Sequence, residues 1–200
     1  MRFFFRWWVF YPALLIAAGA IILASLGPAV LRHEARPVAG AVEDGALVLA
    51  GDALSHAEAS PETVFYVARN AGWRVTGLRV AVLPGNGPVK PEERGLRVLL
   101  AGDMAQALGS GPFRVDVEVA PVPVTTAPFL ALGLDRGGTI EWLTQPVSVV
   151  ESVISYTFAA SASGALQAIA LRPVATLEDY NYGVEIRSIR IVPIAGAGAS

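Results

Sequence analysis

Short runs of alternating apolar and polar residues dominate the chain from about residue 46 onward. The clearest run is FRVDVEV at residues 113–119, where every second side chain is apolar and those between are charged. Such alternation predicts a strand with one buried and one solvated face. The run at 184–192 alternates as well, but its parity changes at Ser188, which predicts a β-bulge there.

Further strands are predicted at residues 46–50, 63–69, 78–82, 96–101, 129–134, 139–143, 152–158 and 165–172. Segment 60–72 stays open, because Ser60 and Pro61 also form a helix start, although its β-branched and aromatic centre favours a strand. A short helix is predicted within 101–111, with Asp103 as its N-cap. Many short strands separated by turns predict an all-β fold, an antiparallel jelly-roll-like β-sandwich.

The first 36 residues have a different pattern. From Trp7 to Leu31 there is no charged side chain, a run of 25 residues. As a helix this run is about 37 Å long, which exceeds a bilayer core of about 30 Å. A cleavable signal has a shorter apolar region. We therefore predict one retained N-terminal transmembrane α-helix, with a long cleaved signal as the alternative.

The flanks and the surface of this run suggest how it would sit in a membrane. Charged and aromatic residues typical of the membrane–water interface gather at its start: Arg2, Arg6, Trp7, Trp8 and Tyr11. Lys and Arg are equally frequent on both flanks, and the short N-terminus favours a cytoplasmic N-terminus. The location predicted is a bacterial-type inner membrane with the C-terminal domain in the periplasm. Small residues that would let another helix approach closely are Gly19, Ala20 and Ala24.

These patterns divide the chain into four parts. We predict a transmembrane anchor helix at residues 1–31, a linker at 32–45, an extracytoplasmic β-sandwich domain at 46–193, and a flexible tail at 194–200.

Composition excludes several functional classes. Residues 37–200 carry 11 basic and 16 acidic side chains, a net charge of −5, which argues against nucleic acid as a partner. The chain has no cysteine and two histidines, so thiolate nucleophiles and multi-histidine zinc sites are excluded. It also lacks a nucleophile elbow, a phosphate loop and a dinucleotide fingerprint. We therefore expect no enzymatic activity and no cofactor.

Two groups of aromatic residues are candidate binding residues. Tyr180, Asn181 and Tyr182 precede the last predicted strand and would form a rim on which the tyrosines stack against a sugar ring. The alternative that we favour is a turn whose tyrosines pack on the sandwich edge. For Trp73 and Trp142 we favour burial, whereas an exposed pair would form a binding platform.

Three stretches resemble carbohydrate-binding modules of the galactose-binding type over about residues 43–193. They are EDGALVLAG, FRVDVEVAP and YGVEIRSIRIVP. The resemblance implies a jelly roll and a glycan partner. In such modules a calcium ion often joins the first and last strands, and Glu43, Asp44 and Asp179 would supply its ligands here. No spaced calcium loop is present, so solvated acidic turns are the favoured interpretation and no metal is predicted.

The start of the chain resembles another family over residues 1–33. The run RWWVFYP before an apolar helix, with His33 near its end, is similar to the α-polypeptide of bacterial light-harvesting antennae. It departs from that family because His33 lies between Arg32 and Glu34, outside the apolar run. The resemblance adds a photosynthetic or respiratory complex to the candidate hosts.

Together these features predict a non-catalytic, membrane-anchored accessory subunit of a larger membrane protein complex. The helix would contact integral membrane partners and membrane lipids, and the sandwich would cap or stabilise the complex. The alternative function is a tethered envelope glycan-binding module.

Overall fold

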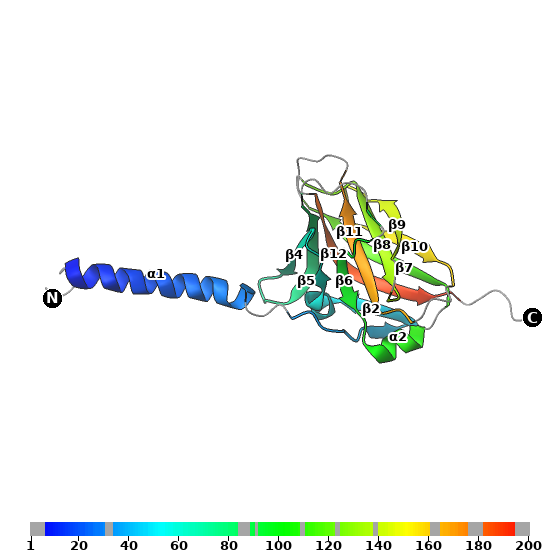
Figure 1. Cartoon of the computed structure of the whole chain (residues 1–200), viewed down its shortest axis with the longest axis horizontal. Coiled ribbons are helices and arrows are strands. Elements are labelled where there is room, and N and C mark those ends of the chain that lie inside the picture. The colour runs from blue at the N-terminus through cyan, green and yellow to red at the C-terminus, as the bar shows by residue number, and fades with distance from the viewer. Residues whose placement is uncertain are drawn as a thin grey trace, which may run out of the picture. The chain divides into compact units, whose positions relative to one another are not determined.

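The computed structural model describes residues 7–30, 34–83, 89–90, 92–108, 111–122, 125–137, 140–160, 165–175 and 182–194. The chain divides into two compact units, Met1–Glu34 and Ala35–Ser200. Both units are drawn in Figure 1.

The first unit contains one helix, α1 (Trp7–Val30), of 24 residues. The helix that the apolar run predicts is therefore present. Within the described residues, however, no helix combines the length and the apolar character that crossing a membrane requires, so the predicted anchor is unsupported.

The residues predicted to lie at a membrane interface or to pack against another helix are only partly described. A Cβ placed on Gly19 would meet no atom within 4 Å, and Tyr11 is exposed. Ala20 is exposed as well. Arg2 and Arg6 lie outside the described residues, as do the side chains of Trp7, Trp8 and Ala24.

The second unit is an antiparallel β-sandwich. One layer is a seven-stranded sheet built from β1 (Ala41–Glu43), β2 (Ala46–Ala50), β4 (Thr63–Arg69), β5 (Val75–Val82), β7 (Phe113–Pro121), β10 (Ser152–Phe158) and β12 (Gly183–Pro193). The other layer is a five-stranded sheet in the order β3 (Glu58–Ala59), β6 (Leu96–Leu99), β11 (Ala168–Val174), β8 (Phe129–Asp135) and β9 (Glu141–Pro146). The 3₁₀-helix η1 (Gly51–His56) and the helix α2 (Gly102–Leu108) are the remaining elements.

Strand β12 organises the seven-stranded sheet. Along one side it pairs with β5 through its first half and with β2 through its second half, while β7 follows its other side throughout. The register against β7 shifts between Ile186 and Ser188, so the predicted β-bulge is confirmed. The bulge restores the parity of the strand, and Ile186 and Ile189 both reach the core.

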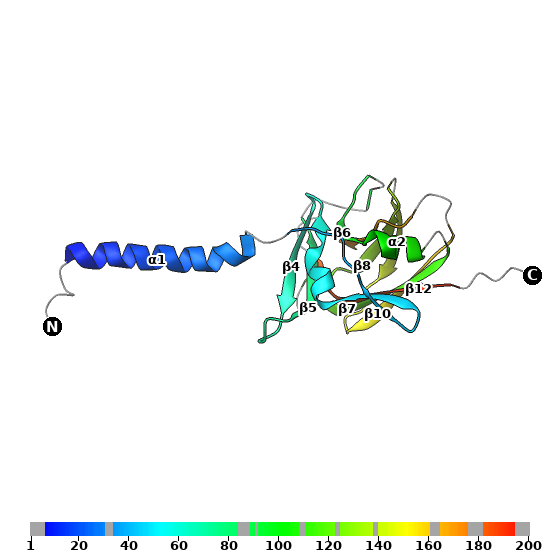
Figure 2. The same cartoon turned by 90° about the horizontal axis from the view of Figure 1, so that it is seen from below.

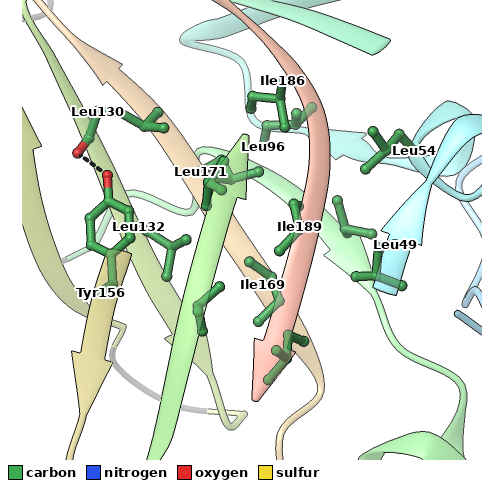
Figure 3. Close-up of a cluster of buried hydrophobic side chains, with 14 of the residues drawn as sticks. Leu49, Leu54, Leu96, Leu130, Leu132, Tyr156, Ile169, Leu171, Ile186 and Ile189 are labelled. Carbon is green, nitrogen blue, oxygen red and sulfur yellow. Dashed lines mark hydrogen bonds between the residues drawn. The ribbon is translucent and has the colours of Figure 1, made fainter. Parts of the chain in front are cut away.

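A single hydrophobic core fills the space between the sheets. It receives leucine and isoleucine side chains from both layers, among them Leu49, Leu132, Ile169, Leu171 and Ile189 (Figure 3). The alternation predicted for residues 113–119 is confirmed, since all four apolar side chains of that run are buried. Residues 35–194 thus hold both sheets and a complete core, as an independently folding domain does.

A hydrogen bond between described residues crosses this core. The hydroxyl of Tyr156, on β10, donates to the carbonyl of Leu130, on β8, over 2.7 Å (Figure 3). Leu130 lies opposite Pro173 in the sheet, and proline has no N–H to offer. Because Tyr156 is fully buried, its phenol needs a partner inside the protein. The hydrogen bond meets that need and joins the two sheets.

Several boundaries differ from the prediction. Part of the predicted linker 32–45 belongs to the sandwich, because Val38 bridges to Leu100 and β1 pairs with β2. Strand β1 has three exposed residues, so it lacks an alternating pattern. The open segment 60–72 contains a strand, β4. Helix α2 begins at Gly102, so Asp103 lies in its first turn and is not the N-cap. Of the predicted tail, Ile194 hydrogen-bonds Pro112, and 195–200 lie outside the described residues.

The inter-sheet hydrogen bond gives a first prediction. Tyr156→Phe removes the hydroxyl and leaves the ring in place, so the free energy of unfolding should fall by about 1–2 kcal/mol. Urea denaturation of the two proteins measures this difference. An unchanged free energy of unfolding would show that the bond contributes nothing net to stability.

The same phenol predicts a pH dependence. Burial raises the pKa of Tyr156 above its ordinary value, so the folded state favours the neutral phenol. This contribution is complete below about pH 10, the pKa of an unfolded tyrosine, and is lost as the pH rises further. Stability should therefore fall more steeply above pH 10 in the wild type than in Tyr156→Phe. Parallel slopes in the two proteins would contradict the assignment.

Candidate functional site

The candidate site lies on the outer face of the five-stranded sheet. One residue from each strand forms a row across this face, as the register shows: Glu58, Arg97, Ala170, Gly133 and Trp142. The neighbours of these residues along β8 and β11 are leucines and isoleucine that point into the core. Because side chains alternate along a strand, the row faces away from the core.

Small residues make room for the indole of Trp142 on this face. A Cβ added to Gly133 would lie 3.2 Å from Cε3 of Trp142, and one added to Gly95 would lie 3.1 Å from Cη2. Gly133 is on β8, while Gly95 directly precedes β6, on the other side of β11. The six-membered ring of the indole therefore extends across β11. Trp142 is half-buried, and its Nε1 has no hydrogen-bond partner among the described residues.

Charged side chains on this face lie in close pairs. Arg97 contacts Asp135 at 2.8 Å and Glu58 at 3.1 Å. Arg172 contacts Glu93 at 2.5 Å. The side chains of Arg172 and Asp135 are 1% and 2% exposed. Removing charges from water is costly unless they are paired, so these contacts fix the positions of both guanidinium groups.

A pocket of about 350 Å³ opens beside Arg97. Four carboxylates and two guanidinium groups line it, with three uncharged residues: Glu58, Glu62, Glu92, Glu93, Arg94, Arg97, Ala59, Ser60 and Pro61. A hydrogen bond with Ser60 lowers the pKa of Glu62, and the positive charges of Arg172 and Lys90 lower it further. Burial lowers the pKa of Arg172, and the neighbouring Glu93 opposes that effect. The pocket is therefore rich in charged hydrogen-bonding groups at neutral pH.

Within the part of the chain that the structure describes, no group of three or more His, Asp or Glu side chains is placed to hold a metal ion. The face instead combines an aromatic surface with hydrogen-bonding groups in fixed positions. This combination is typical of small-molecule and saccharide sites, in which apolar contacts give affinity and a few polar groups give orientation.

Among the predicted site residues that the structure describes, the two tryptophans do not come together. Trp142 lies on this face, whereas Trp73 lies in the β4–β5 turn and is 80% exposed, so the favoured burial of Trp73 is wrong and the two indoles form no pair. Tyr182 is half-buried and packs against the core. Tyr180 and Asn181 lie outside the described residues, as does Asp179.

Sequence reasoning missed the charged residues of the face. Arg97, Asp135 and Arg172 each sit in an otherwise apolar strand, and Glu93 lies in a loop. A signal was available in FLALGLD at residues 129–135, where leucine alternates with alanine, glycine and finally aspartate. That pattern indicates a strand with large apolar side chains on its inner face and small side chains along most of its outer face.

Comparison with known proteins gives structural resemblance only. No protein-family model matches the chain, and no curated protein does. Similar solved structures include the CBM22-1 xylan-binding domain from Paenibacillus barcinonensis Xyn10C, with 11% identity, TM-score 0.47, and coverage of 70% of this chain and 87% of that one. The low-affinity xylan-binding module CBM86 from Roseburia intestinalis has 17% identity, TM-score 0.45, and coverage of 76% and 98%.

A third similar structure, the apo form of CBM1 of BiXyn10A, has 10% identity, TM-score 0.44, and coverage of 69% and 88%. All three similar structures are carbohydrate-binding modules, the class of protein that the sequence resembles. At these identities and TM-scores the resemblance says nothing about a ligand of this chain.

The buried ion pair gives a prediction for the site. Arg172→Met leaves Glu93 buried without its cation, and losing one partner of a buried pair costs about 3–5 kcal/mol. Urea unfolding should show a loss of this order. Arg187→Gln is the control, since Arg187 is 42% exposed and its contacts with Glu151 and Glu185 are longer, at 3.5 and 3.8 Å. The control should lose less than about 1 kcal/mol, and equal losses would contradict a special role for the buried pair.

Proposed function

We propose that the jelly-roll-like sandwich of residues 35–194 is a non-catalytic glycan-binding module. Its ligand site is the outer face of the five-stranded sheet. The observation that carries the proposal is the indole of Trp142, which extends across a floor of small residues on the face that also carries Arg97 and Glu58. An aromatic surface with charged groups at its edge matches a sugar ring, which is apolar on its C–H face and polar around its rim.

The residues would divide the work of binding. The indole would cover the C–H face of one sugar and remove apolar surface from water. Arg97, held by Asp135 and Glu58, would donate hydrogen bonds to the hydroxyl oxygens of the sugar. The carboxylate of Glu58 would accept hydrogen bonds from the sugar's hydroxyl groups. Because the ion pairs already hold Arg97 in place, little side-chain freedom would be lost on binding.

Mutation of Trp142 tests the proposal. Isothermal titration with a panel of soluble polysaccharides, xylan among them, should identify at least one ligand of the wild-type protein. Trp142→Ala should lower the affinity for that ligand by about tenfold or more, because it removes the largest apolar contact. Circular dichroism and urea unfolding establish that the variant is folded.

A second site variant and a control variant extend the test. Glu58→Gln keeps the shape of the side chain and removes its charge, so it should weaken binding while the fold is retained. Trp73→Gly, in the β4–β5 turn, should leave polysaccharide affinity unchanged. A wild-type protein that binds no polysaccharide, or a Trp142→Ala variant that binds as well as the wild type, would refute the proposal.

The predicted cellular setting is a separate matter. An inner-membrane location with a periplasmic sandwich stays a prediction from residues 1–36 of the sequence. No observation within the described residues favours the predicted role as an accessory subunit of a membrane complex, so the glycan-binding alternative is the function proposed.

A further inference from the structure

The turn between β4 and β5 presents an aromatic side chain to solvent. Trp73 is 80% exposed, and its φ of 60° lies in the left-handed region, which non-glycine residues rarely adopt. In Figure 2 this turn, at the end of the hairpin formed by β4 and β5, extends beyond the body of the sandwich. A bulky residue in a strained conformation that does not pack against the core indicates a role outside the fold.

Hydrogen bonds hold the turn in this conformation. The side-chain oxygen of Asn70 accepts from the amides of Gly72 at 2.9 Å and Arg74 at 3.1 Å. The amide of Trp73 donates to the carbonyl of Asn70 at 2.9 Å. The guanidinium of Arg69 donates to the carbonyl of Trp73 at 3.0 Å. The indole is therefore presented on an ordered turn.

The hairpin has a charge opposite to that of the rest of the domain. Residues 63–83 contain three arginines and no acidic residue, whereas residues 37–200 together have a net charge of −5. Arg79 is paired with Glu185 at 2.6 Å. The positive charge of the turn therefore comes from Arg69 and Arg74, one on each side of the exposed indole.

We propose that this turn, residues 69–74, contacts an anionic lipid surface. Tryptophan favours the depth of the lipid headgroups, and arginines beside it would pair with phosphate groups. The shape of the turn favours a lipid surface as the partner. A projecting side chain cannot enclose a saccharide or a small ligand as a concave site does, but it can enter a fluid interface. The proposal is independent of the glycan site, which lies on the other sheet.

Co-sedimentation with lipid vesicles tests the proposal. The fragment 35–200, which holds the complete core, is mixed with vesicles of phosphatidylcholine alone or of phosphatidylcholine with phosphatidylglycerol. We expect binding to the anionic vesicles only, and weaker binding as salt is added. Trp73→Gly should lower the partition by about tenfold or more, and glycine accepts the left-handed conformation, so this variant folds. Arg74→Gln should lower the partition by about fivefold.

Matched measurements separate this proposal from the glycan site. Trp142→Ala should bind anionic vesicles as the wild type does, whatever happens to its polysaccharide binding. Equal binding of the wild type to both vesicle types, or full binding by Trp73→Gly, would overturn the lipid contact. So would a Trp73→Gly variant that loses polysaccharide affinity, because the turn would then be a second glycan contact.

Discussion

The site depends on two strands, β8 and β11, that are buried on both faces. Each sends leucine or isoleucine into the core and alanine or glycine outward along most of its length. The large inner residues hold the two sheets together, and the small outer residues leave the space in which an indole lies. The limit is steric, since a Cβ on Gly133 would come within 2.2 Å of Ile140 and 3.2 Å of Trp142. One methyl group at this position would therefore clash with Ile140 and press on the edge of the indole.

Ion pairs on the outer face are the second feature on which the site depends. Arg172 and Asp135 are buried on the outer face, where neither water nor the core can stabilise them. Glu93 and Arg97 do so instead, and Glu93 belongs to the loop before β6. The loop is thereby joined to the sheet at the edge of the pocket. The same ion pairs thus compensate the buried charges and order the polar groups on the face that carries Trp142.

Local patterns predicted the strands well and the site poorly, for a physical reason. Alternation and the parity change at Ser188 depend on neighbours along the chain, and both the strand at 113–119 and the bulge are present. The surroundings of Trp142 depend on Gly95 and Gly133, which only sheet registers bring together. The favoured burial of Trp73 is wrong, because this side chain is 80% exposed. The side chain of Trp73 is exposed because it lies in a turn that Asn70 stabilises. A pattern of apolar and polar residues does not predict the hydrogen bonds of that turn.

The segment that joins α1 to the sandwich has a mechanical consequence. Residues 35–40 lie along the domain, where Arg36 bonds the carbonyl of His56, and Val38 bonds Leu99 and Ala101 through its backbone. A pull transmitted through the chain from α1 would reach these bonds before it reached β2 or β12. These backbone hydrogen bonds would therefore bear such a load before the paired strands of the sheet.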